Sequence, residues 1–288
     1  MVCNTALDKI SKIDLVEYLV EDFPLVLGEN PVGPHGICTY KENIITANNY
    51  NNSMSVINLK DKKEGNNIYI GAHPNDVRVL KDKAYVICGE SNSLGIVDLL
   101  NNKIIFNLKM DGYPHSLEIF QEKEIAYIGN MEGSSVSLVD CCTNVVINKI
   151  KVGEYPTKVL LSKNKKNLFV CESYLGADVQ GYVSIISTDT QKIIKKVKVG
   201  RTPIDICEED EILYISNFGE GSISIVDVNK GVEVMKIDVG GMPKGIVKYG
   251  DKIYFGEYQY GSIYEINLKN KRIKKIASGM EPNAIILI

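Results

Sequence analysis

Seven prolines recur at nearly equal intervals, and this repeat constrains the fold more than any other feature of the sequence. Successive positions differ by 40, 40, 42, 47, 40 and 39 residues, for Pro34, Pro74, Pro114, Pro156, Pro203, Pro243 and Pro282. An apolar residue lies three places after each proline: Ile37, Val77, Leu117, Val159, Ile206, Ile246 and Ile285. A fixed period of this length is typical of a chain built from repeated supersecondary units.

Each repeat carries the pattern of several short strands. An apolar strand such as Tyr214–Ser216 is followed by a glycine-rich turn and then by a strand that alternates small and branched residues, as in Ser222–Asp227. A polar turn precedes a last strand such as Val232–Val239. Period-two alternation bounded by Gly, Pro and Asn is typical of β-strands. With the strand that starts at the proline, each repeat matches one four-stranded blade of a β-propeller.

The intervals between prolines define complete blades, and the two ends of the chain combine into one more. The complete blades are 34–73, 74–113, 114–155, 156–202, 203–242 and 243–281. Residues 282–288 match an innermost strand, and Met1–Asn4, Ile10–Asp14 and Phe23–Gly28 match the second, third and fourth strands. The sequence therefore predicts one all-β domain over 1–288, a seven-bladed β-propeller whose shared blade is 1–33 with 282–288. Pairing the C-terminal strand with the N-terminal strand would remove open sheet edges.

The strand that ends in asparagine carries a resemblance to a known family. Tyr127–Asn130 and Tyr214–Asn217 resemble the YVTN-type repeat of surface-layer-like seven-bladed β-propellers. The resemblance covers essentially the whole chain. It implies the fold and leaves the function open, because such propellers include adhesins, scaffolds, DNA-binding proteins and modules of enzymes. The sequence has no tryptophan, so the Trp-Asp signature of WD-repeat propellers is absent.

Composition and charge argue against several functional classes. A net charge of −3 with interspersed lysines is unlike a nucleic-acid-binding protein, which needs a basic face. The lysine-rich stretches Lys192–Lys198 and Lys269–Lys275 are expected to be outer edge strands, where lysine blocks edge-to-edge pairing. No segment has the apolar length that would span a bilayer. Without a secretory signal and with seven cysteines, an odd number, we expect a cytoplasmic protein unless a leader has been removed.

All three histidines lie at proline corners: His35, His73 and His115. Proline corners and the loops between second and third strands share one face, which we name the top face, and they converge on the central channel where propellers bind ligands. His35 and His115 share a repeat position with Asn75, Thr157, Ile204, Lys244 and Asn283. The histidines could form a metal or catalytic site. Alternatively, they hydrogen-bond the backbone as Asn or Thr would, in blades that hold the rings too far apart for one ion.

The residue that ends each second strand is a further candidate position. The series reads Asn4, Asn48, Cys88, Asn130, Glu172, Asn217 and Glu257. Asparagine is expected to satisfy backbone groups at the turn. Cys88, Glu172 and Glu257 depart from it, and two carboxylates could bind a cation or sugar hydroxyls or act as acid and base. For each carboxylate alone we favour a solvated turn residue.

Aromatic residues gather in the loops of the top face. They are Tyr50, Tyr113, Tyr155, Tyr174, Phe218, Tyr258 and Tyr260. A tyrosine ring has a rigid apolar face and a polar tip, which suits the binding of a protein, peptide or glycan. The blade 156–202 also contains an insertion, Tyr174–Tyr182, which we expect to be a docking loop or lid.

The sequence contains no recognised enzyme motif: no Gly-x-Ser-x-Gly elbow, phosphate loop, paired CxxC or HExxH. The first hypothesis is a non-catalytic binding or scaffolding propeller without a cofactor, which recognises a protein, peptide or glycan at the top face. The alternative is a top-face hydrolase or lyase, with or without a metal ion, that uses the histidines with Glu172 or Glu257. A purely structural cell-surface protein conflicts with the missing leader and the free cysteines. The candidate ligand-binding residues are His35, His73, His115, Tyr50, Cys88, Glu172, Tyr174, Phe218, Glu257 and Tyr258.

Overall fold

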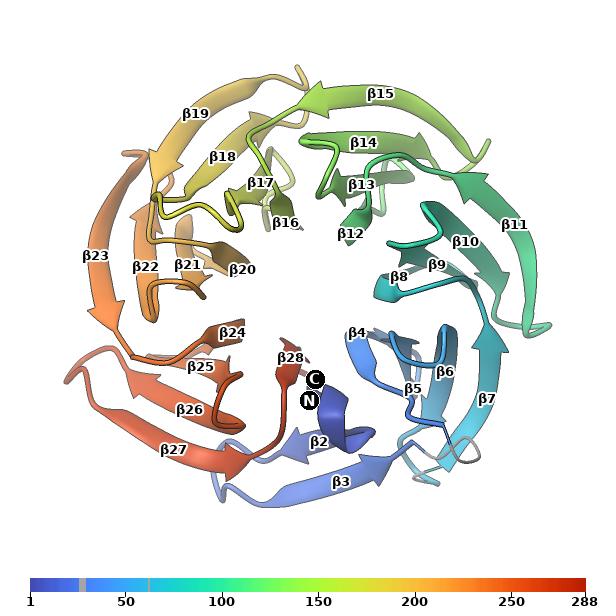
Figure 1. Ribbon diagram of the computed structural model, residues 1–288, viewed down its shortest axis with the longest axis horizontal. Coiled ribbons are helices and arrows are strands. Elements are labelled where there is room, and N and C mark those ends of the chain that lie inside the picture. Colours follow the sequence, from blue (N-terminus) through green and yellow to red (C-terminus); the bar gives the residue numbers. More distant parts are fainter. Residues whose placement is uncertain (26–29, 62) are drawn as a thin grey trace.

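The computed structural model of the chain describes residues 1–25, 30–61 and 63–288. Its strands form seven four-stranded antiparallel sheets that are arranged as blades around a central axis (Figure 1). This arrangement confirms the predicted seven-bladed β-propeller. Among the described residues, no helix is long and apolar enough to cross a membrane.

The blades are numbered here in chain order, and the strands of each are given from the axis outward. Blade 1 joins the two ends of the chain and consists of β28 (Pro282–Ile285), β1 (Val2–Asn4), β2 (Lys9–Ile13) and β3 (Val20–Pro24), with the short 3-10 helix η1 (Thr5–Leu7) between β1 and β2. Blade 2 consists of β4 (Pro34–Tyr40), β5 (Asn43–Asn48), β6 (Ser53–Asn58) and β7 (Lys63–Tyr69). Blade 3 consists of β8 (Pro74–Leu80), β9 (Lys83–Cys88), β10 (Ser93–Asp98) and β11 (Lys103–Lys109).

The remaining blades repeat this order. Blade 4 consists of β12 (Pro114–Phe120), β13 (Ile125–Asn130), β14 (Ser135–Asp140) and β15 (Val145–Lys151). Blade 5 consists of β16 (Pro156–Leu161), β17 (Asn167–Glu172), β18 (Tyr182–Ser187) and β19 (Ile193–Lys198). Blade 6 consists of β20 (Pro203–Glu209), β21 (Ile212–Asn217), β22 (Ser222–Asp227) and β23 (Val232–Asp238). Blade 7 consists of β24 (Pro243–Tyr249), β25 (Lys252–Glu257), β26 (Ser262–Asn267) and β27 (Ile273–Ser278).

One predicted strand begins at the wrong place. The outer strand of blade 1 was expected over Phe23–Gly28, but β3 starts at Val20 and ends at Pro24. The strand starts early because Asp14 closes a tight turn, in which its carboxylate accepts the N–H groups of Val16 and Glu17, both at 2.8 Å. Residues 26–28 lie outside the described residues.

The hydrophobic core lies between neighbouring blades. Second and third strands are buried on both faces, as in β13, where every residue after Ile125 is buried. One cluster joins blade 3 to blade 4 through Tyr85, Leu117 and Ile128. Outer strands such as β15 are mostly exposed. The stretch Lys192–Lys198 forms the outer strand β19, as expected for an edge that avoids further pairing, whereas Lys269–Lys275 enters the outer strand β27 only from Ile273 onward.

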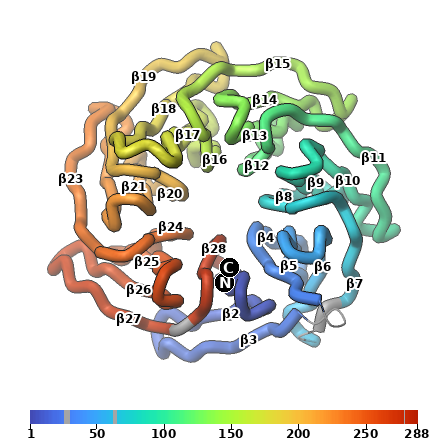
Figure 2. Tube along the Cα trace, in the orientation of Figure 1, coloured from blue at the N-terminus to red at the C-terminus, as the bar shows by residue number. Residues whose placement is uncertain are grey.

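The two termini close the ring. Strand β28 pairs antiparallel with β1, which brings both ends of the chain to the same place near the axis (Figure 2). The Met1 amino group donates a hydrogen bond to the Ile286 carbonyl at 2.8 Å. The Thr5 hydroxyl accepts from Asn283 Nδ2 and donates to the Pro34 carbonyl, both at 2.7 Å, so blade 1 is tied to blade 2 as well.

Candidate functional site

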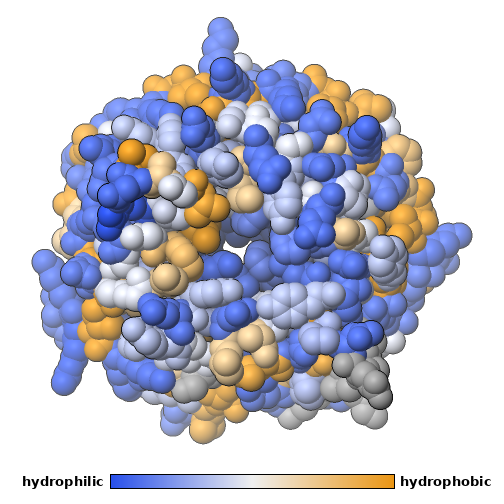
Figure 3. All heavy atoms as spheres, viewed as in Figure 1, coloured by the Kyte–Doolittle hydropathy of each residue, from blue (hydrophilic) through white to orange (hydrophobic). Residues whose placement is uncertain are grey.

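A narrow opening lies at the centre of the top face, surrounded mainly by hydrophilic residues, with an apolar patch beside it over β20 (Figure 3). Below the opening is a cavity of about 40 Å³. The second residue of every inner strand lines this cavity: His35, Asn75, His115, Thr157, Ile204, Lys244 and Asn283. We name these residues the channel-mouth ring.

Ring side chains form hydrogen bonds to the next blade. His35 Nδ1 lies 2.8 Å from the Asn75 carbonyl, and His115 Nδ1 lies 2.8 Å from the Thr157 carbonyl. Asn75 Nδ2 donates to the Pro114 carbonyl at 3.2 Å, and the Thr157 hydroxyl donates to the carbonyl of the proline of blade 6 at 2.8 Å. The expected backbone bonds are therefore present, and they connect blades rather than closing a corner within one blade.

Two of the three histidines come together. The ring centroids of His35 and His115 are 6.1 Å apart, with the ring planes at 81°. The two rings are therefore edge to face with each other, although they belong to blades that are not adjacent. Burial lowers the pKa of His35 well below its ordinary value, helped by the charge of Lys244. Burial also lowers the pKa of His115 to about 4, so both imidazoles are neutral at physiological pH.

His73 lies apart from this pair, at the corner before β8. Its Nδ1 is 2.8 Å from the Tyr113 hydroxyl, and its Nε2 is 3.4 Å from the Asn49 side-chain amide. Both nitrogens of His73 therefore have partners.

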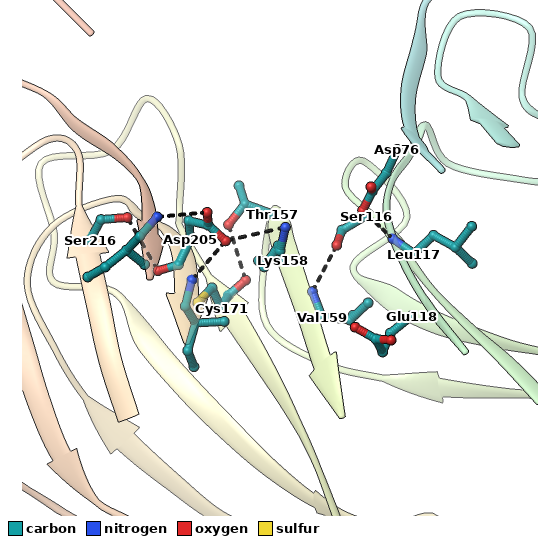
Figure 4. A network of polar contacts seen from close by, with 12 residues as sticks. Asp76, Ser116, Leu117, Glu118, Thr157, Lys158, Val159, Cys171, Asp205 and Ser216 are labelled. Atoms are coloured by element: carbon teal, nitrogen blue, oxygen red, sulfur yellow. Dashed lines mark hydrogen bonds and ion pairs between the residues drawn. The ribbon is translucent and has the colours of Figure 1, made fainter. Parts of the chain in front are cut away.

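A belt of charged residues lies below the channel-mouth ring, one residue farther along the inner strands. None of these residues was predicted from the sequence. Asp76, Lys158 and Asp205 occupy the third position of their inner strands and line both the upper cavity and a lower cavity of about 330 Å³. Lys158 Nζ is 3.3 Å from Asp205 Oδ1, and Arg78 is 2.7 Å from Asp76 (Figure 4 shows part of this network). The belt therefore divides the channel into an upper and a lower part.

The belt also joins neighbouring blades. Asp76 Oδ2 accepts the backbone N–H of Leu117 at 3.1 Å, and Asp205 Oδ2 accepts that of Ile246 at 3.2 Å. A sequence signal for the belt existed: in Pro74–Leu80, polar Asp76 and Arg78 alternate with valines that face the core. Polar residues at period two on an innermost strand face the channel.

Glu172 and Glu257 were expected to be solvated turn residues, and this prediction is wrong for both. Glu172 is fully buried at the end of β17, where it accepts from the Ser184 hydroxyl at 2.6 Å and pairs with Lys196 at 2.5 Å. Glu257 is 4% exposed and accepts backbone N–H groups, from Met242 at 3.0 Å and Tyr260 at 2.6 Å. Glu172 therefore has partners on the third and outer strands of its blade, Glu257 has backbone partners at the loops, and neither carboxylate lines the upper cavity.

Cys88 and the asparagines of the same series are also structural. Burial raises the pKa of Cys88 to about 12, so it remains a thiol. The asparagines bond to serine hydroxyls of the third strand rather than to the backbone groups that were expected. These bonds join Asn48 to Ser53 and Ser55, Asn130 to Ser135 and Ser137, and Asn217 to Ser222 and Ser224.

Three candidate aromatic residues form an arc beside the channel mouth, which we name the aromatic crescent: Phe218, Tyr258 and Tyr50. The rings of Phe218 and Tyr258 are 5.9 Å apart at 64°. Tyr50 donates to Glu281 at 3.0 Å. Lys244 Nζ lies 5.0 Å from the centre of the Tyr258 ring, and burial lowers the pKa of Lys244 to about 8.

The insertion of blade 5 forms a second aromatic group. The rings of Tyr174 and Tyr182 are 5.9 Å apart, and Lys196 Nζ lies 5.2 Å from the Tyr182 ring. The loop is anchored to the next corner by the 2.5 Å ion pair of Asp178 with Arg201. The apolar side chains of the insertion remain about half exposed.

Comparison with known proteins supports the fold and does not decide the function. No protein-family model and no curated protein matches the sequence. Among solved structures, hydrazine synthase of Kuenenia stuttgartiensis has a TM-score of 0.75 at 15% identity, over 85% of this chain and 79% of that one. Virginiamycin B lyase from Staphylococcus aureus has a TM-score of 0.74 at 16% identity, over 87% and 86%. A catalytically inactive variant of that lyase with quinupristin has a TM-score of 0.77 at 17% identity, over 91% of both chains.

Proposed function

We propose that this propeller is a binding or scaffolding protein that recognises a protein, peptide or glycan segment on its top face. The observation that carries the proposal is the aromatic crescent, in which rings from blades 2, 6 and 7 lie beside the channel mouth with Lys244 and Glu281 between them. Aromatic faces with polar tips provide a large contact area at a small entropic cost.

The crescent is held in place before any ligand arrives. The N–H groups of Phe218 and Tyr258 donate to the carbonyls of Thr202 and Met242, at 2.9 and 3.0 Å. The tip of Tyr50 is fixed by Glu281. A preorganised surface loses less conformational entropy on binding, which favours recognition.

Catalysis has weaker support. The Staphylococcus aureus lyase is an enzyme on this fold, and one of its structures is of a catalytically inactive variant, so a hydrolase or lyase remains the alternative. In this chain, however, Glu172 already pairs with Lys196 of the outer strand, and Glu257 already accepts backbone N–H groups. A general acid or base must reach the substrate, and neither carboxylate lines the upper cavity.

The test is binding of immobilised protein to peptide and glycan arrays, with Tyr258→Ala and Tyr174→Ala as the test variants. Tyr249→Ala is the matched control, because Tyr249 is 61% exposed and ends β24 on the opposite face of the blade that carries Tyr258. We expect the control to keep the bound ligands and Tyr258→Ala to weaken them at least about tenfold, as for a truncated anchor residue. Retention of every ligand by both test variants would sink the proposal.

A further inference from the structure

Four residues of the channel-mouth ring each use a side-chain N–H in a hydrogen bond and also carry an acceptor atom. In four consecutive blades the ring residues are Asn283, His35, Asn75 and His115. Three of them, His35, Asn75 and His115, give a side-chain N–H to the next blade, and Asn283 gives one to Thr5 within blade 1. Each of these side chains therefore keeps an acceptor lone pair. The amide oxygens of Asn75 and Asn283 are buried and have no hydrogen-bond partner in the described part of the chain.

The two imidazoles of the ring have the same arrangement as metal-binding histidines. A carbonyl oxygen only accepts, so Nδ1 of His35 and of His115 carries the proton and Nε2 carries the lone pair. Neither Nε2 has a hydrogen-bond partner among the residues that the structure describes. A histidine whose second nitrogen donates to a backbone carbonyl has a fixed tautomer and orientation, as metal ligands usually do.

The size of the cavity and the separation of the rings suit a single ion. About 15 Å³ of such volume is enough for one water, so about 40 Å³ accommodates an ion with a little water. The ring centroids are 6.1 Å apart across this cavity. Within the described ranges no group of three or more His, Cys, Asp or Glu is placed to hold a metal, so a site here has two imidazoles and open positions.

We propose that the channel mouth binds one first-row transition-metal ion of the zinc, nickel or copper class, through Nε2 of His35 and Nε2 of His115. Imidazole nitrogen is the donor that these ions share. Water and the amide oxygen of Asn75 complete the coordination. This metal site does not depend on the proposed ligand recognition at the top face, and either proposal can fail without the other.

Lys244 is the one group of the ring that opposes a cation. It lines the same cavity, and its charge acts on His35. Its ammonium group also contacts the face of the Tyr258 ring, beside the cavity. Replacing Lys244 should therefore tighten metal binding while leaving both imidazoles intact.

The test is calorimetric titration of untagged protein with zinc, nickel and copper(II) chlorides, on a Cys142→Ser background because Cys142 is an exposed thiol. The test variants are His35→Asn and His115→Asn, since Asn75 shows that asparagine can bond to the next blade from this position. The matched control is His73→Asn, the remaining histidine of the chain, whose nitrogens both have partners.

We expect one ion per chain in the parent and in His73→Asn, at least tenfold weaker binding in either test variant, and tighter binding in Lys244→Gln. Absence of binding in the parent overturns the proposal. So does binding that survives both test variants or disappears only in His73→Asn. Should a test variant fail to fold, the copper(II) spectrum of the parent decides: superhyperfine coupling to imidazole nitrogen supports the site, and its absence refutes it.

Discussion

The two ring nitrogens of each histidine in the channel-mouth ring are in different environments. Nδ1 joins the next blade, as asparagine and threonine do at the same repeat position, and Nε2 has no hydrogen-bond partner in the part of the chain that the structure describes. The two interpretations offered by the sequence are therefore compatible. The sequence predicts the ring because repeat register alone fixes which residues share a level. It did not predict the direction of each Nδ1–H, because that depends on how close the neighbouring blade lies.

The burial of His115 predicts a pH-dependent stability. Its pKa falls from 6.5 to about 4 in the folded state. Between these values the unfolded chain binds a proton that the folded chain excludes, so the free energy of unfolding decreases as the pH falls. At about 1.4 kcal/mol for each pKa unit, the loss approaches 3 kcal/mol by pH 4. The charged and titratable groups that act on His115 or line its cavity are His35, Lys244, Asp76, Lys158 and Asp205.

Urea unfolding at pH 7 and pH 5, with chelator present, measures this effect against His115→Asn. The variant keeps the bond to the next blade and lacks the titrating ring, so we expect it to lose less stability on acidification. The carboxylates titrate in both proteins and cancel in the difference. Equal losses in the two proteins would show that His115 does not carry the pH dependence.

Strands were predictable from the sequence because their pattern is local, whereas the partners of their last residues were not. Period-two alternation located β17 and β18, but Glu172 lies opposite Tyr182 and bonds to Ser184, two residues farther along β18. That contact depends on register across an insertion that no other blade has. The charge of Glu172 is then balanced by Lys196 from the outer strand, and this ion pair raises the pKa of Lys196 in spite of burial, which opposes it.

The repeat supplies a graded test of this contact. Glu172→Ala should lower the free energy of unfolding by about 2–4 kcal/mol, because it removes a buried ion-pair partner and leaves Ser184 without its acceptor. Glu172→Asn should cost about 1 kcal/mol less, since Asn130 and Asn217 bond to the equivalent serines of their blades. Urea unfolding measures both variants. An asparagine variant no more stable than the alanine variant would contradict the shared role of this position.

The ring as a whole depends on a short strand at each end of the chain. Repeat arithmetic predicted this closure, because the residues outside the complete blades supply one inner strand and three outer ones. The structure adds contacts that no repeat pattern contains. Tyr18 of blade 1 donates to Glu265 of blade 7 at 2.9 Å, and Lys252 of blade 7 donates to the Tyr18 hydroxyl at 3.3 Å. These contacts fasten the shared blade to the preceding blade along its outer part.

Removing residues 282–288 should therefore destabilise the whole propeller. The deletion removes β28, exposes the pairing edge of β1 and leaves Thr5 without Asn283. A loss of several kcal/mol lowers the melting temperature of a domain of this size by about 10 °C or more, and the exposed edge favours aggregation. Deletion of residues 287–288 alone is the control, because both lie beyond β28 and are exposed. Differential scanning calorimetry with light scattering distinguishes the two. If the longer deletion melted like the control and stayed monomeric, closure by β28 would contribute little and the remaining blades would hold the ring by their packing alone.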